Sequence, residues 1–206
     1  MNTLSQMGNF SFNRKVETRR LTQRSTDFTN SFYENTIQSK SLYKDIDADI
    51  KKLGKLSEIT HLGGGPSLIL FSNKKENTLF QMIQFLATSI DELTELKGND
   101  IAVLTPYIET LTFLQQNLKS KTKSRNYLIE SVDRVQGLDV DYCFYVIPKS
   151  SSFSYNLNRF NVATSRAKKC TYILAEQDFD HFVNLPNEVS SYLSKLRNEF
   201  SFNISS

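Results

Sequence analysis

The stretch that decides the fold is Tyr142–Ile147, which reads YCFYVI, an unbroken apolar run of strand length. A strand with one face in water alternates apolar and polar residues, so a strand that is apolar throughout is buried on both faces. Three further runs have the same character: Ser67–Ser72 (SLILFS), Ile101–Leu104 (IAVL) and Thr171–Ala175 (TYILA). These four runs, with a short fifth at Tyr127–Ile129, predict the strands of a sheet that is covered on both sides.

Segments with helical periodicity lie between these strands. From Leu79 to Leu93 the apolar residues recur at spacings of 3, 4 and 7, which is typical of one face of a helix, and Gly98-Asn99 should end it. Further helices are predicted at Asp27–Asn35, Ile108–Leu118, Leu157–Lys168 and, after Pro186, Val189–Phe200. Helices between strands permit parallel pairing, so the sequence predicts a three-layer α/β domain with a mainly parallel sheet flanked by helices. In such sheets function gathers in the loops at the carboxyl ends of the strands.

Composition sets broad limits on the class of protein. With 206 residues, 39% of them apolar, and four prolines, the chain fits one globular domain with an added arm. Residues 1–60 are polar and form the predicted arm, and the turn LGGGP at Leu62–Pro66 leads into the main domain, 61–206. A formal charge of +3 is too small to imply a nucleic-acid partner by itself.

The sequence lacks the signals of secretion, membrane insertion and metal binding. Met1–Phe12 has no long apolar run, and no stretch approaches the roughly 20 apolar residues of a membrane span. We therefore expect a soluble cytoplasmic protein without a membrane partner. Cys143 and Cys170 each lie in an apolar run without a second Cys or a His at metal-binding spacing, so we expect no metal site.

Three polar segments are the candidates for chemistry, and each has a plain structural interpretation. Thr105-Pro106-Tyr107 resembles an ordinary strand-to-helix turn. Glu130–Asp141 is either a loop with a tight turn at Gly137 or a set of groups that holds phosphate, sugar or water. Leu157–Lys168 is either an amphipathic helix with a solvated face or an anion site, because no acidic residue occurs from Leu157 to Tyr172.

Taken in order, these segments resemble motifs of superfamily 1 helicases. TPY at Thr105–Tyr107, SVDRVQGLDVD at Ser131–Asp141 and NRFNVATSRAK at Asn158–Lys168 are similar to motifs IV, V and VI, with the closest likeness to the 1B branch. Arg20, followed by a short aromatic helix, is similar to the segment that opens the second motor domain of that family. The likeness spans Arg20 to Lys169 and implies a RecA-like C-terminal motor domain.

The resemblance also implies a role for individual residues. Arg166 matches the arginine finger that meets the γ-phosphate of ATP, and Arg20 resembles a second arginine at that phosphate, although a plain surface arginine beside Arg19 is the alternative. The implied nucleotide-binding positions are Gln136, Gly137 and, for the ribose, Asp139. The implied nucleic-acid contacts are Thr105, Pro106, Ser131, Asp133 and Asn161.

The sequence contains neither of the two elements that anchor ATP and Mg²⁺ in a complete motor. Gly63–Ser67 is rich in glycine but has no Lys and leads into a strand, and Asp91-Glu92 lies within a predicted helix. A first RecA-like domain is therefore the expected partner, along with single-stranded DNA or RNA, and this chain alone should not hydrolyse ATP. The alternative is a non-catalytic nucleic-acid-binding or interaction module derived from a helicase, but Arg166 and Gln136 favour the enzyme.

Overall fold

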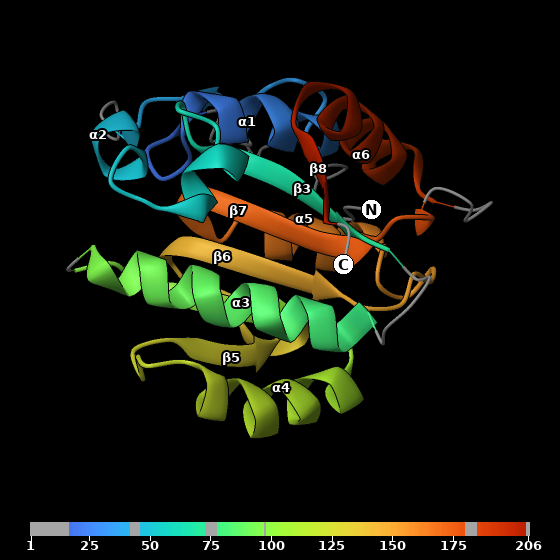
Figure 1. The fold of residues 1–206 in the computed structure, drawn as a ribbon. Coiled ribbons are helices and arrows are strands. Elements are labelled where there is room, and N and C mark those ends of the chain that lie inside the picture. Colours follow the sequence, from blue (N-terminus) through green and yellow to red (C-terminus); the bar gives the residue numbers. More distant parts are fainter. Residues whose placement is uncertain (1–16, 42–45, 73–77, 97, 180–184, 205–206) are drawn as a thin grey trace.

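The computed structural model describes residues 17–41, 46–72, 78–96, 98–179 and 185–204, and its main feature is a six-stranded parallel sheet (Figure 1). Every neighbouring pair of strands runs in the same direction, in the order β5-β4-β6-β7-β3-β8. The strands are β3 (Gly65–Phe71), β4 (Ile101–Thr105), β5 (Leu128–Ser131), β6 (Val140–Ile147), β7 (Ala167–Glu176) and β8 (Ser201–Ile204). A separate small parallel pair joins β1 (Glu17–Thr18) to β2 (Gln38–Ser39).

Helices cover both faces of the sheet, which confirms the predicted three-layer, RecA-like α/β fold. One face packs against α2 (Ile46–Ile50), the 3-10 helix η3 (Lys55–Ile59), α3 (Thr78–Glu95) and α4 (Ile108–Lys121). The other packs against α1 (Gln23–Thr29), α5 (Leu157–Thr164) and α6 (Asn187–Glu199). Figure 1 shows α3 and α4 in front of the strands and α5 behind them. Among the described residues, no helix has the length and apolar character needed to cross a membrane.

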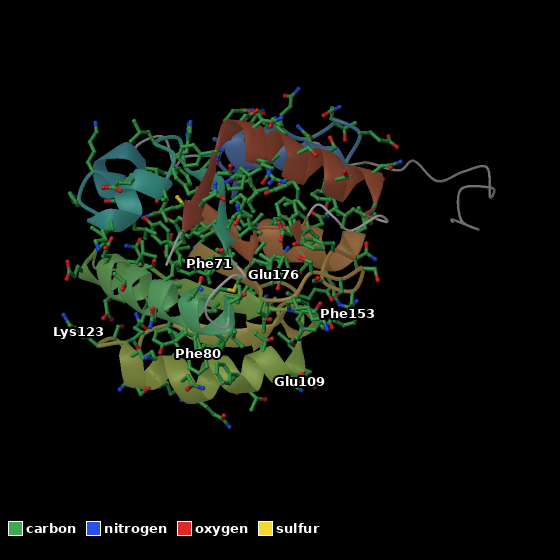
Figure 2. All side chains as sticks on the ribbon, turned by 45° about the vertical axis from the view of Figure 1, so that its right-hand side comes forward. Phe71, Phe80, Glu109, Lys123, Phe153 and Glu176 are labelled. Carbon is green, nitrogen blue, oxygen red and sulfur yellow. The ribbon has the colours of Figure 1, made fainter. Side chains whose placement is uncertain are left out.

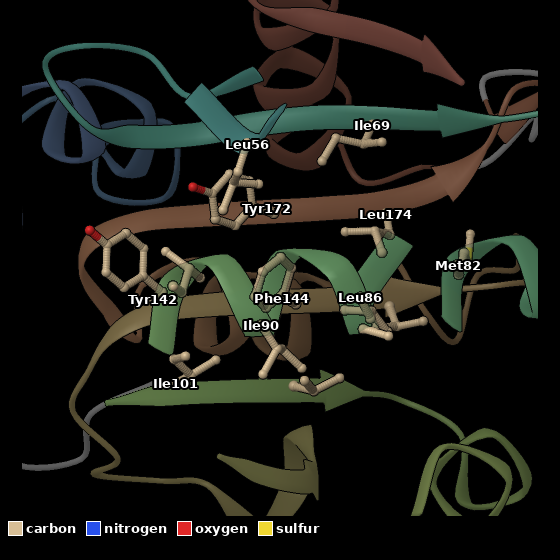
Figure 3. Close-up of a cluster of buried hydrophobic side chains, with 14 of the residues drawn as sticks. Leu56, Ile69, Met82, Leu86, Ile90, Ile101, Tyr142, Phe144, Tyr172 and Leu174 are labelled. Carbon is tan, nitrogen blue, oxygen red and sulfur yellow. The ribbon is translucent and has the colours of Figure 1, made fainter. Parts of the chain in front are cut away.

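Strand β6 shows why the central strands are apolar throughout. Tyr142 and Phe144 belong to the core beneath α3, whereas Cys143 and Tyr145 belong to the core beneath α5 and α6. On the α3 side the ring of Phe144 stacks on that of Tyr172, with centroids 4.8 Å apart and planes at 20°. Figure 3 shows both rings between the strands and α3. Successive side chains therefore enter two different cores, and neither face of the strand meets water.

Because all six strands are parallel, the loops fall into two groups, which we call the carboxyl end and the amino end of the sheet. The carboxyl end lies where the strand arrowheads point in Figure 1 and includes the residues that follow Thr105, Ser131 and Ile147. The amino end lies opposite, where Val140 and Ala167 begin their strands. Helix α5 starts at the carboxyl end, after β6, and finishes at the amino end, before β7.

Three predicted elements were wrong at their bounds. The helix expected at Leu157–Lys168 ends at Thr164. Strand β7 begins at Ala167 because the chain pairs there with Val140 of β6, and pairing with β3 follows from Cys170. The helix expected at Asp27–Asn35 is α1, capped by the Thr22 side chain, followed by the 3-10 helix η2 (Asn30–Phe32); Glu34 and Asn35 have positive φ, which no α-helix accepts.

The C-terminal helix was also expected to run to Phe200. Helix α6 ends at Glu199, and the chain then forms β8, a strand that the sequence analysis did not predict.

The turn before β3 needs glycine because the chain is crowded there. Gly64 has a φ of +68°, and a Cβ atom at this position would lie 2.5 Å from the Lys169 carbonyl oxygen and 2.8 Å from a methyl group of Ile46. The Arg24 guanidinium of α1 donates hydrogen bonds to the carbonyls of Gly64 and Pro66 on the same turn. The polar N-terminal region is thereby attached to the start of the sheet.

Gly64 and Gly98 form a matched pair for testing this crowding, since Gly98 also has a positive φ (+84°) but a Cβ atom there would meet nothing within 4 Å. We expect Gly98→Ala to lose ~1–2 kcal/mol of unfolding free energy, the cost of a left-handed alanine. Gly64→Ala should lose a further ~1–3 kcal/mol from overpacking. Urea denaturation followed by circular dichroism measures both, and equal losses in the two variants would contradict the crowding argument.

Candidate functional site

The predicted site residues occupy both ends of the sheet. Thr105 and Ser131 end their strands at the carboxyl end. Arg166 and Asp139 directly precede β7 and β6 and lie at the amino end. The expectation that all candidate segments gather at the carboxyl end was therefore wrong for Arg166, because α5 carries the chain from one end of the sheet to the other. The candidate site thus consists of two separate parts.

At the amino end, two cations lie within 4 Å of the Asp139 carboxylate, and a third, Arg166, is close enough to interact with it electrostatically. Arg20 Nε lies 3.7 Å from one oxygen of Asp139, and Lys168 Nζ lies 3.9 Å from the other. Burial lowers the pKa of Arg166, and the nearby charge of Arg20 lowers it further, while Asp139 acts in the opposite direction. We call Arg20, Arg166, Lys168 and Asp139 the cation cluster. Its formal charge of three cations and one anion makes it a favourable place for a further anion.

The side chain of Arg166 is held in place by groups of the neighbouring chain. Its Nε donates to the Val162 carbonyl at 2.9 Å, and Nη2 donates to Ser165 Oγ at 3.1 Å. Nη1 donates to the Leu138 carbonyl at 3.5 Å, which ties the end of α5 to the loop before β6. An arginine has five N–H donors, so part of this half-buried guanidinium stays available for a ligand.

Two buried polar atoms near the cation cluster lack a hydrogen-bond partner among the described residues: Arg20 Nε and Asn161 Oδ1. The amide nitrogen of Asn161 donates to the Tyr33 hydroxyl at 3.0 Å, and Tyr33 is close enough to influence the pKa of Arg166. An unsatisfied buried group costs about 1–3 kcal/mol unless a ligand completes it. Arg20 Nε is a donor and fits an oxygen atom of a phosphate, whereas Asn161 Oδ1 is an acceptor and fits a donor such as a hydroxyl group.

Gln136 and Gly137 lie in the exposed loop between the 3-10 helix η4 (Val132–Arg134) and β6. Gly137 has a φ of +86°, and the Leu138 amide closes the turn by donating to the Val135 carbonyl at 3.0 Å. Since Leu138 also accepts from Arg166, this loop adjoins the cation cluster. In the part of the chain that the structure describes, no group of three His, Cys, Asp or Glu side chains could hold a metal ion.

At the carboxyl end, most of the predicted nucleic-acid contacts are buried. The side chains of Thr105, Pro106 and Ser131 do not face solvent, and Thr105 Oγ1 accepts from the Tyr107 amide. Asp133 is exposed and accepts a hydrogen bond from Arg159 Nε at 2.9 Å. Within this group, Asp133 is the residue whose side chain can meet a ligand directly.

The expectation of a basic helix without acidic partners was wrong. Arg159 pairs with Asp133, and Lys169, which lies in β7, pairs with Asp49 at 3.1 Å. These carboxylates are far away in sequence, so a search of the local segment could not find them.

Sequence reasoning missed three further residues of the two sites. Lys168 belongs to the cation cluster, and Tyr33 lies next to it. Phe153 packs on Arg159 at the carboxyl end of the sheet. Lys168 could have been found from its place within the motif that contains Arg166. Phe153 could have been found as an aromatic residue in the polar run Lys149–Ser154.

Comparisons with known proteins bear on the family and the fold. A family model described as an AAA domain matches residues 19–178. The C-terminal domain of a possible DNA helicase from Lactobacillus plantarum WCFS1 has a similar fold, with a TM-score of 0.51, 14% sequence identity, and coverage of 90% of this chain and 98% of that chain. A search of curated proteins found no match.

Asp139 should compete with any anion that binds the cation cluster. We expect Asp139→Asn to bind inorganic tripolyphosphate about fivefold more tightly at low salt, because removing a charge near 4 Å is worth ~1 kcal/mol in water. Isothermal titration calorimetry measures the change. Asp133→Asn, at the opposite end of the sheet, is the control and should bind like the unmodified chain. Unchanged affinity in Asp139→Asn would show that the anion binds elsewhere.

Proposed function

Since the chain belongs to the AAA domain family, we propose that it is the second RecA-like motor domain of a superfamily 1 helicase and acts as half of an ATP-driven motor on nucleic acid. In this proposal the amino end of the sheet faces the ATP held by a first motor domain. The carboxyl end faces a single strand of DNA or RNA.

The observation that carries the proposal is the position of Arg166 within the cation cluster. Its guanidinium is fixed by Val162 and Leu138, stands beside Arg20, and keeps N–H donors for a ligand. When bound, ATP would supply the phosphoryl group whose transfer to water drives the motor, and Mg²⁺ would help to neutralise the charge of its phosphates. Arg166 would donate to the γ-phosphate oxygens as charge builds on them, and Arg20 would add a second donor.

The other residues of the cluster complete the proposed nucleotide side. Gln136 and Gly137 lie in the loop whose Leu138 carbonyl accepts from Arg166, and Asp139 would offer a carboxylate to the ribose hydroxyls. We assign Asn161 to this side as well, because its amide contacts Tyr33 next to Arg166. The sequence has no phosphate-binding loop, so ATP and Mg²⁺ would be held mainly by the first domain.

The carboxyl end supplies the proposed path of the nucleic-acid strand. Asp133 is exposed there, and the backbone that follows the buried Thr105, Pro106 and Ser131 lies in the same group of loops. Contacts with phosphate and sugar would be independent of base sequence.

An arginine finger acts on the transition state more than on the bound nucleotide. In the motor that joins this domain to its first domain, Arg166→Ala should therefore lower ATP turnover about 1000-fold or more while most of the nucleotide affinity remains. Steady-state turnover and binding of a fluorescent ATP analogue measure the two effects separately. Arg19→Ala, which removes an exposed arginine next to Arg20, is the control and should turn over normally. A normal rate in Arg166→Ala would refute the proposed role.

A further inference from the structure

The two edges of the sheet differ in how they are protected. Strand β5 forms one edge and β8 the other, and in the part of the chain that the structure describes neither has a second neighbouring strand. Both strands have four residues, so length does not distinguish them. An exposed edge strand is a template for pairing with another chain, and proteins block it with charged side chains, with proline or with a covering element.

The β5 edge is blocked in this way. Four exposed cations lie shortly before the strand: Lys119, Lys121, Lys123 and Arg125. Figure 2 shows Lys123 at the periphery of the molecule, near the end of α4. Within the strand, Glu130 adds a charge, and Gln115 Nε2 of α4 donates to the Ile129 carbonyl at 3.5 Å. A second copy of the chain that approached this edge would therefore meet like charges.

The β8 edge lacks these devices. Residues 200–206 read FSFNISS, a sequence without a charged residue or a proline. The Leu68 amide of β3 donates to the Phe200 carbonyl at 3.2 Å, so this carbonyl points toward β3. Because successive residues of a strand direct their backbone groups to opposite sides, the N–H and C=O groups of Ser201 and Asn203 point to the open edge.

One face of β8 carries apolar side chains beside a cavity. Phe202 lies level with Ile69, and Ile204 lies level with Phe71; both of these β3 residues belong to the core beneath α3. Phe202 and Ile204 therefore face the α3 side, where both are half-buried. A cavity of about 440 Å³ opens there between η3 and α3, and its walls include Ile204 and Phe85. Apolar side chains of a further strand would be buried at this place.

We propose that two copies of this chain associate through β8, as antiparallel neighbours related by a two-fold axis at Phe202. In this register Ser201 of each copy lies opposite Asn203 of the other, and such a pair exchanges both of its backbone hydrogen bonds. The two Phe202 side chains form the closer pair between them, with Cβ atoms ~5 Å apart on the α3 side. Because the contact is symmetric and closed, association stops at the dimer.

The occupant of the edge is a second copy because β8 itself has the properties that the edge requires. The edge accepts an uncharged strand with an apolar side chain on the α3 side, and Phe202 supplies that side chain. In the dimer, Phe202 of one copy lies diagonally opposite Ile204 of the other, within reach of the cavity. The β8 edge is separate from both ends of the sheet, so the inference does not depend on the proposed function.

Two variants of Asn203 test pairing through the backbone. Asn203→Pro removes the outward N–H and leaves the bonds to β3 in place, whereas Asn203→Ala keeps the N–H. We expect sedimentation equilibrium to show a reversible dimer of the unmodified chain at ~10–500 µM. Asn203→Pro should raise the dissociation constant at least ~5-fold, and Asn203→Ala should leave it unchanged. An unmodified chain that stays monomeric over this range, or equal weakening by both variants, overturns the inference.

Two charged variants of Phe202 test the position of the two-fold axis. Phe202→Lys alone and Phe202→Glu alone place like charges opposite each other, whereas an equimolar mixture pairs Lys with Glu. We expect each variant alone to sediment as a monomer and the mixture to sediment as a dimer. A dimer of either variant alone, or a mixture that stays monomeric while circular dichroism shows both variants folded, overturns the inference. Should either variant not fold, the two Asn203 variants decide alone.

Discussion

Parallel pairing of the six strands sends all of their carboxyl ends to one side of the sheet and all of their amino ends to the other. Backbone hydrogen bonds between the strands impose this arrangement. A parallel sheet of this kind is stable only when helices cover both of its faces. The division of the loops follows from it. Loops that precede strands bring Arg166 and Asp139 together, whereas loops that follow strands bring Tyr107 and Phe153 together. A cationic group and an aromatic group can therefore occupy opposite ends of one small domain without overlapping.

Helix α5 joins the two ends. It has eight residues and spans about 12 Å. Arg159, in its first turn, contacts Phe153 and Asp133, and Arg166, just beyond its last turn, contacts the loop before β6. A short helix is stiff along its axis, so a shift at one end moves the other. In the proposed motor, this geometry would link the nucleic-acid path at the carboxyl end to the placement of Arg166.

The central strands could be predicted from the sequence because runs such as Tyr142–Ile147 are apolar on both faces, and that property depends on burial alone. The end of α5 could not be predicted from the sequence, because Ala167 and Lys168 fit a helical stripe as well as the start of a strand. In the structure, pairing of Ala167 with Val140 makes this segment the start of β7. The motifs identified Arg166 and Asp139, whose grouping the structure shows. The partners of Lys168 and Lys169 and the burial of Thr105 depend on contacts between distant segments, which no local pattern contains.

The position of β3 in the sheet has a consequence for biosynthesis. Its hydrogen-bonding neighbours are β7 and β8, and Gly65 pairs with Cys170. At 5–20 residues per second, the roughly hundred residues between them take about 5–20 s to emerge from the ribosome. For that interval a seven-residue strand, buried along its whole length in the finished protein, has no partner strand. Early packing of β3 against α3, or capture by a chaperone, would be needed to keep the nascent chain from aggregating.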